Sequence, residues 1–177
     1  MTRLHECSML SHAEKRPGKD LLGGRRAGGL NVNDLIRDVM QAMQGTVEKK
    51  VKLQAIPADR DVRVMADRED MGRALETLVA YGSEIIRKGG TVTMLVKMLP
   101  IENALLKSSG GGCALLSVSS KDVDRSCSGA NHMARKSLRR AFRVIRSVIL
   151  GYNGSVRVLR QQGSAAFNIY LPVLRET

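Results

Sequence analysis

Two long segments of the sequence, residues 67–89 and 135–150, carry apolar residues at helical spacing along one side only. In the first segment the apolar stripe includes Met71, Leu75 and Leu78. In the second segment it consists of Leu138, Ala141, Phe142, Ile145, Val148 and Ile149. A helix that is apolar on one side must bury that side against another element. The chain therefore needs a second layer for these helices to cover.

Alternating apolar residues predict that this second layer is a β-sheet. Residues 51–55 and 62–66 alternate, with turn-forming residues between them, and suggest a hairpin-like pair of strands. Further strand-like runs cover residues 91–99, 113–119, 155–160 and 165–171. An additional helix of about three turns is expected to begin after Asn33, a good N-cap residue, and to end near Gly45. The order predicts an α+β fold, a two-layer sandwich with three helices on one face of a mixed, mostly antiparallel sheet.

Residues 1–30 are rich in glycine and charge, and we expect them to form a flexible lead-in or linker remnant. Residues 31–177 are then one domain, because 177 residues suit a single core. No uncharged run is long enough to span a membrane. The three cysteines form no close pair and the N-terminus lacks the apolar core of a signal peptide, so we expect a cytoplasmic protein.

The chain is strongly basic, with 29 Lys and Arg against 17 Asp and Glu and a net charge of +12. No acidic residue lies between Asp124 and Glu176. The second long helix carries much of the excess, at Arg135, Lys136, Arg139, Arg140, Arg143 and Arg146. Such a face suits an acidic protein or a nucleic acid, and its alternative is a solvated surface. Only 3% of the residues are aromatic, which disfavours single-stranded nucleic acid, where bases stack on aromatic rings.

Three features together resemble a known family. They are the order of elements, the segment Leu30 to Val39, and the C-terminal run from Gly151-Tyr152-Asn153-Gly154 to Leu171-Pro172. The resemblance is to the ATP-binding catalytic domain of sensor histidine kinases, and it covers about residues 30–174. It implies the same α+β sandwich, ATP and Mg²⁺ as ligands, and a role in two-component signalling.

In that family an Asn on a helix ligates Mg²⁺, an Asp-x-Gly-x-Gly turn reads adenine, and a Gly-x-Gly-Leu loop approaches the phosphates. The Asn position falls on Tyr81 and the Asp position on Ser120, while the glycines of the turn fall on Asp122 and Asp124. The phosphate loop falls on Arg139-Arg140-Ala141-Phe142. No position carries the family residue, although a shift of two residues would give Asp122 the adenine-reading role. If ATP binds, the resemblance implies contacts from Tyr81, Ser120, Asp122, Arg139 and Arg140.

The sequence leaves three functions open. The first is a signalling protein with degenerate nucleotide motifs that binds an acidic partner, such as a response-regulator receiver domain, through the basic helix. The second is a divergent ATP-binding kinase domain, and the third is a basic nucleic-acid-binding module. His12 lies in a segment that faintly resembles the phosphoacceptor box of histidine kinases, but Ala13 stands where the family has a carboxylate. We assign no catalytic residue and no metal site from the sequence.

Overall fold

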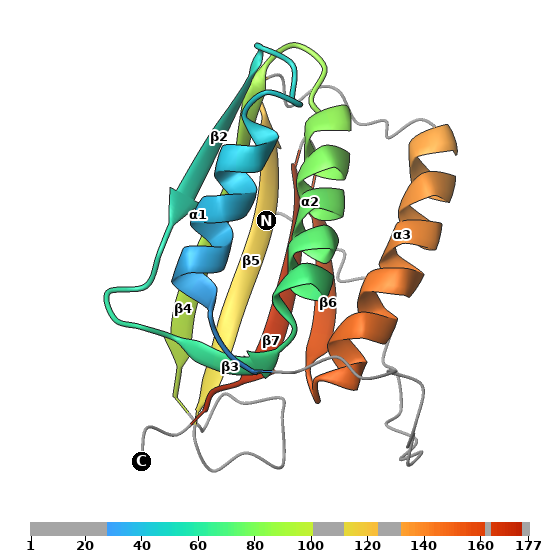
Figure 1. Cartoon of the computed structure of the whole chain (residues 1–177). Helices are drawn as coiled ribbons and strands as arrows, with labels where there is room; N and C mark the ends of the chain where they lie inside the picture. The colour runs from blue at the N-terminus through green and yellow to red at the C-terminus, as the bar shows by residue number, and fades with distance from the viewer. Residues whose placement is uncertain (1–27, 101–111, 124–131, 162–163, 175–177) are drawn as a thin grey trace, which may run out of the picture.

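Three helices lie side by side on one face of a β-sheet in the part of the chain that the structure describes (Figure 1). This computed structural model describes residues 28–100, 112–123, 132–161 and 164–174. The helices are α1 (Val32–Met43), α2 (Arg68–Glu84) and α3 (His132–Gly151). The predicted two-layer α+β sandwich is confirmed.

The main sheet has five strands in the order β2-β4-β5-β7-β6 within the described ranges. They are β2 (Val51–Ile56), β4 (Gly90–Leu99), β5 (Cys113–Asp122), β7 (Ser164–Pro172) and β6 (Ser155–Gln161). The β2–β4 pair is parallel and the other pairs are antiparallel. The sheet is therefore mixed and mostly antiparallel, as expected.

The hairpin predicted over residues 51–66 is not formed. Strand β2 pairs with β4, while β3 (Arg63–Ala66) pairs with a strand that the sequence did not predict, β1 (Gly28–Asn31). The reason is a set of hydrogen bonds between Asn33 and the loop that connects β2 to β3. The buried side chain of Asn33 donates to the carbonyl oxygens of Ala58 and Arg60, at 3.2 and 2.9 Å, and accepts from the Ala58 N–H. These hydrogen bonds attach the loop to α1 and keep the two strands apart.

The structure also corrects the N-cap that the sequence predicted for α1. Asn31, not Asn33, caps this helix, and its side-chain oxygen accepts from the Asn33 N–H at 3.0 Å. Strand β1 lies just before it, so the described fold reaches slightly into the segment predicted as a lead-in. Residues 1–27 lie outside the described residues. The predicted cap of α2 is confirmed, because Asp67 accepts from the backbone N–H groups of Glu69 and Asp70.

The core lies between the helices and the sheet. Its largest fully buried side chains come from both layers: Leu35, Ile36, Met71, Leu75, Leu78, Ile86, Met94, Leu116, Ile149, Phe167, Ile169 and Leu171. The turn after α3 needs Gly154, because a Cβ there would lie 2.7 Å from the carbonyl oxygen of Tyr170. Asn153, just before it, is left-handed, with φ of 57°. This turn returns the chain from α3 to the edge strand β6.

Candidate functional site

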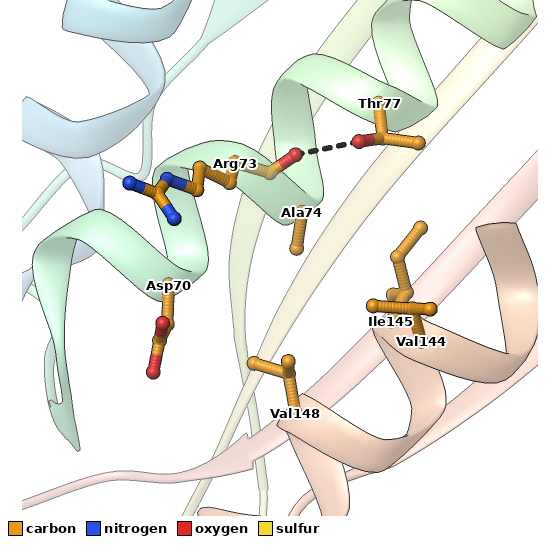
Figure 2. Close-up of a pocket in the computed structure, with 7 residues that line it drawn as sticks. All are labelled: Asp70, Arg73, Ala74, Thr77, Val144, Ile145 and Val148. Carbon is orange, nitrogen blue, oxygen red and sulfur yellow. Dashed lines mark hydrogen bonds between the residues drawn. The ribbon is translucent and has the colours of Figure 1, made fainter.

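A groove of about 330 Å³ lies between α2 and α3 (Figure 2). Its lining residues are Asp70, Arg73, Ala74 and Thr77 from α2, and Val144, Ile145 and Val148 from α3. The α2 residues recur at intervals of three and four, which places them on one helical face. In Figure 2 the side chain of Ala74 points from α2 toward the valines and isoleucine of α3. The walls that face each other across the groove are therefore apolar.

Each polar side chain of this groove has a partner within the protein. The Thr77 hydroxyl donates to the Arg73 carbonyl oxygen at 2.8 Å. The Arg73 guanidinium forms an ion pair with Glu69 and points away from α3 in Figure 2. The Asp70 carboxylate accepts a hydrogen bond from the Tyr152 hydroxyl at 3.0 Å. Among the described lining residues, the charge facing the groove is thus a carboxylate.

The Tyr152–Asp70 hydrogen bond joins the end of α3 to the first turn of α2. Burial raises the pKa of the Tyr152 hydroxyl above its ordinary value, and the hydrogen bond from that hydroxyl to Asp70 raises the pKa further. The phenol therefore stays protonated and able to donate. This contact joins the two helices at one end of the groove.

Tyr81 lies one helical turn beyond Thr77 on α2 and is buried in the core, 5% exposed. Its ring meets that of Phe167 on β7 edge to face, with ring centroids 5.7 Å apart. Aromatic pairs favour this geometry because the positive edge of one ring faces the negative face of the other. The phenol thus occupies the position where the resemblance places a metal-ligating Asn.

Ser120 and Asp122 lie on β5, with their side chains buried beneath the helix layer. The Ser120 hydroxyl donates to the Ala165 carbonyl oxygen at 3.4 Å. The Asp122 carboxylate accepts from the Arg87 backbone N–H at 2.9 Å, which holds the loop between α2 and β4 against the end of β5. Neither residue lines the groove. Asp124 and His12 lie outside the described residues.

The basic residues predicted for partner binding all lie on α3. Arg139, Arg143 and Arg146 are exposed, and their helical spacing places them on one face. Arg135, Lys136 and Arg140 lie on the same helix, but their side chains are outside the described part. In Figure 1, α3 is the outermost helix of the layer, next to α2 and on the side away from α1. The three exposed arginines therefore lie on the outermost helix of the layer.

The structure places the sequence-predicted residues in three separate environments. Tyr81 and Ser120 lie between α2 and the sheet, Asp122 braces a loop, and the arginines form an outer face. The groove itself was not predicted. The sequence signal for the groove is Val144, an apolar residue that lies outside the predicted stripe of α3. In the structure its side chain is 62% exposed. The described residues contain no cluster of potential metal ligands and no helix long and apolar enough to cross a membrane.

Comparison with known proteins rests on structure alone. No protein-family profile matches the chain, and no curated protein matches it in sequence. Among solved structures, the catalytic domain of histidine kinase ThkA superposes with a TM-score of 0.62 at 17% identity, covering 82% of this chain and 94% of that domain. The chain has the fold of a histidine kinase catalytic domain.

Two further structures have the same histidine-kinase fold. The mycobacterial sensor histidine kinase MprB gives a TM-score of 0.62 at 15% identity, covering 84% of this chain and 100% of that one. Full-length ShkA in complex with AMPPNP gives 0.63 at 15% identity, covering 85% of this chain and 32% of ShkA. The suspected resemblance is confirmed as a structural match. At these identities the likeness establishes the fold.

Proposed function

We propose that this protein is a two-component-type signalling protein that uses the histidine-kinase fold to bind an acidic protein partner. In this proposal it does not hold ATP in the way of the family it resembles. The observation that carries the proposal is the buried position of the Tyr81 side chain. A buried phenol packed on Phe167 stands where the family has an Asn that ligates Mg²⁺. Mg²⁺ prefers small oxygen ligands in octahedral geometry, and an aromatic ring in the core is a poor substitute.

The groove supports the same proposal on electrostatic grounds. It lies between the two helices that, in the resemblance, carry the metal-ligating Asn and the phosphate loop. A triphosphate needs cations or converging backbone N–H groups. The described groove instead has apolar walls and the Asp70 carboxylate, which would repel phosphate. The residues described there do not fit ATP, so we derive no catalytic step from it.

Titration calorimetry with ATP and Mg²⁺ tests this part of the proposal. We expect no binding heat at millimolar nucleotide, with a nucleotide-binding histidine kinase domain measured in parallel as the positive control. The alternative is a divergent ATP-binding kinase domain, which we keep because full-length ShkA, a structure with a similar fold, is in complex with AMPPNP. Saturable binding of ATP to this protein would support that alternative and contradict our proposal.

The partner-binding part of the proposal rests on α3. Arg139, Arg143 and Arg146 are exposed on one face of α3, and the sequence of this helix contains no acidic residue. Complementary charge accelerates association and selects acidic partners. Response-regulator receiver domains, which the resemblance implies as partners, present an acidic phosphorylation pocket. They are therefore the first acidic partners to test.

The experiment compares two double charge reversals. Purified receiver domains from the same genome are tested for binding to wild-type protein, to Arg139→Glu/Arg143→Glu and to Lys52→Glu/Arg157→Glu. The second pair are exposed cations of β2 and β6, so both variants have the same net charge. We expect salt-sensitive binding that is lost in the α3 variant and kept in the control.

Equal loss in both variants would mean that overall charge, and not α3, drives the association. Duplex DNA and single-stranded RNA are included as further analytes. Binding to these alone, with an affinity that falls steeply with the logarithm of salt, would favour the nucleic-acid alternative and contradict the proposed partner.

A further inference from the structure

We infer that the groove between α2 and α3 binds a lysine side chain of a second protein, with the aliphatic stem on the apolar walls and the ammonium group at Asp70. This site is additional to the proposed function, because it gives α3 a second binding face with the opposite charge preference. It does not depend on the acidic partner, since the two faces consist of different residues.

The groove and the exposed arginines lie on opposite sides of α3. Successive residues of a helix are rotated by about 100°, so Val144, Ile145 and Val148 share one side of this helix. The same rotation places the three exposed arginines on the opposite side, and none of them lines the groove. The chemistry of the groove is therefore set by its own lining residues.

The groove presents a negative charge at one end. The Asp70 carboxylate lines it and accepts a hydrogen bond from the Tyr152 hydroxyl at 3.0 Å. That hydroxyl is a neutral donor, so the pair keeps the charge of the carboxylate. The cation of Arg73, the other charged lining residue, is balanced by its ion pair with Glu69. A carboxylate can accept about four hydrogen bonds, so a cationic donor can bind Asp70 beside Tyr152.

The walls next to Asp70 fit an aliphatic chain. Ala74 lies one turn further along α2, and Val148 and Ile145 line the groove opposite it on α3 (Figure 2). Ala74 and Ile145 are only 5% and 2% exposed, whereas Val144 is 62% exposed and opens the groove to solvent. A side chain projecting from another protein can therefore enter past Val144 and cover buried apolar surface.

Lysine matches this combination of apolar walls and a terminal carboxylate. Its methylene stem packs on apolar surface while its ammonium group stays at a polar end. The Tyr152 hydroxyl already contacts one oxygen of Asp70, at 3.0 Å. This favours the compact ammonium group of lysine over the planar guanidinium of arginine, which binds both carboxylate oxygens at once. Charge complementarity thus selects a lysine of a partner as the occupant.

The first test separates the charge of the ligand from its apolar stem. A peptide with one central lysine among glycines and serines is titrated into methyl-labelled full-length protein. The control peptide has norleucine in place of the lysine, which keeps the stem and lacks the charge. We expect the lysine peptide to shift the methyl signals of Ile145 and Val148, and the norleucine peptide to bind about tenfold more weakly. Unchanged signals with the lysine peptide, or equal binding of both peptides, would overturn the inference.

The second test changes the protein at both ends of the proposed contact. Asp70→Asn removes the charge of the groove, and Glu84→Gln removes an exposed charge at the last residue of the same helix. We expect the lysine peptide to bind Asp70→Asn about tenfold more weakly and Glu84→Gln like wild type. Equal affinity for Asp70→Asn and wild type would show that the carboxylate does not hold the ammonium group, and the inference would be wrong.

Val144→Asn and Leu150→Asn make the same comparison for the apolar wall. The two side chains are 62% and 51% exposed on α3, and only Val144 lines the groove. We expect about threefold weaker binding of the lysine peptide by Val144→Asn and no change for Leu150→Asn. Equal weakening by both substitutions would contradict binding in the groove.

The remaining outcomes distinguish this site from other occupants. Retained lysine-peptide binding in Arg139→Glu/Arg143→Glu would support the groove, whereas its loss would place the peptide elsewhere and overturn the inference. Methyl shifts caused by ATP and Mg²⁺ but not by the lysine peptide would assign the groove to nucleotide and overturn both proposals.

The chain's own basic residues are tested in the same way. Arg25 and Arg26 shortly precede β1 in the sequence, and the first residue of β1 pairs with Ala66, just before α2. The lysine peptide is therefore also titrated into Arg25→Ala/Arg26→Ala, and we expect the affinity of wild type. Binding to this variant but not to wild type would mean that these residues occupy the groove, which would overturn its assignment to a second protein.

Discussion

The ring of Tyr81 packs against Phe167 and joins the middle of the helix layer to the sheet. At its neighbour Gly82 the backbone of α2 lies close to the sheet, since a Cβ at residue 82 would lie 3.4 Å from both Ser120 and Val92. The close approach of α2 to β4 and β5 and the insertion of the phenol therefore occur at adjacent residues. In our proposal, this packing takes the place that metal ligation has in the family that the chain resembles.

We predict that Tyr81→Ala lowers the free energy of unfolding by about 3 kcal/mol, because it removes a buried ring and leaves a cavity beside Phe167. Tyr81→Phe keeps the edge-to-face pair and should lower it much less. Urea denaturation of the two variants and the wild type measures the difference. A Tyr81→Ala variant as stable as wild type would show that the ring does not carry the packing assigned to it.

Tyr152 and Asp70 make the groove sensitive to alkaline pH. The pKa of Tyr152 is raised in the folded protein, mainly by burial and then by its hydrogen bond to Asp70. A raised pKa means that the folded state favours the neutral phenol. The stability that this provides is complete below the ordinary pKa of 10.0 and is lost as the pH rises through the higher folded value.

We predict that Asp70→Asn lowers the pKa of Tyr152 toward the ordinary value, because it removes the negative charge while leaving the burial in place. The ionisation is followed by the ultraviolet absorbance of tyrosinate, and subtraction of the Tyr152→Phe titration isolates Tyr152. An unchanged midpoint in Asp70→Asn would mean that burial alone raises the pKa.

At the scale of elements, two asparagines at the start of α1 have different roles. Asn31 caps the helix through one hydrogen bond to a backbone N–H. Asn33 is buried and holds three backbone groups of the loop between β2 and β3. That loop carries the chain from the edge of the main sheet to the small β1–β3 sheet, so Asn33 couples α1 to both sheets.

We predict that Asn33→Ala lowers the free energy of unfolding by about 2 to 3 kcal/mol, because it leaves buried backbone groups without partners. Asn31→Ala should cost only about 1 kcal/mol, the usual value for an N-cap. Chemical denaturation of both variants provides the comparison. The reverse order would support the cap position that the sequence suggested.

At the scale of the whole molecule, β1 is the first element of the described part of the chain. Its residue Leu30 is buried, 6% exposed, and the strand pairs along its length with β3. β3 in turn contacts the end of β7, through a bridge between Val64 and Val173. The start and the end of the described fold therefore meet at the same side of the molecule.

We predict that a chain beginning at residue 28 melts at the same temperature as the full chain, in keeping with the expectation that the preceding segment is a lead-in. A chain beginning at residue 32 loses the buried Leu30 and the Asn31 cap, together about 3 kcal/mol, and should melt roughly 10 °C lower. Thermal denaturation of the two truncations measures this. A lower melting temperature for the first truncation would show that residues 1–27 support the fold.

The sequence by itself determined the fold class. Helical stripes such as that of Met71, Leu75 and Leu78 and the alternating strands have fixed periods, so the local pattern specifies which elements form and which faces they bury. The cap at Asp67 and the basic face of α3 could also be predicted, because both depend on residues close together in the chain. The resemblance to histidine kinases rested on the same order of elements.

Only the tertiary structure decided how these elements pair and what lies between them. The separation of β2 from β3 depends on Asn33 reaching a loop more than twenty residues away in sequence, and no local pattern contains such a contact. Likewise, the edge-to-face contact between the rings of Tyr81 and Phe167 joins residues that are far apart in the sequence. The groove lies between α2 and α3, two helices that are distant in sequence and are joined by the hydrogen bond between Tyr152 and Asp70. Long-range packing therefore gave the candidate site its shape and its chemistry.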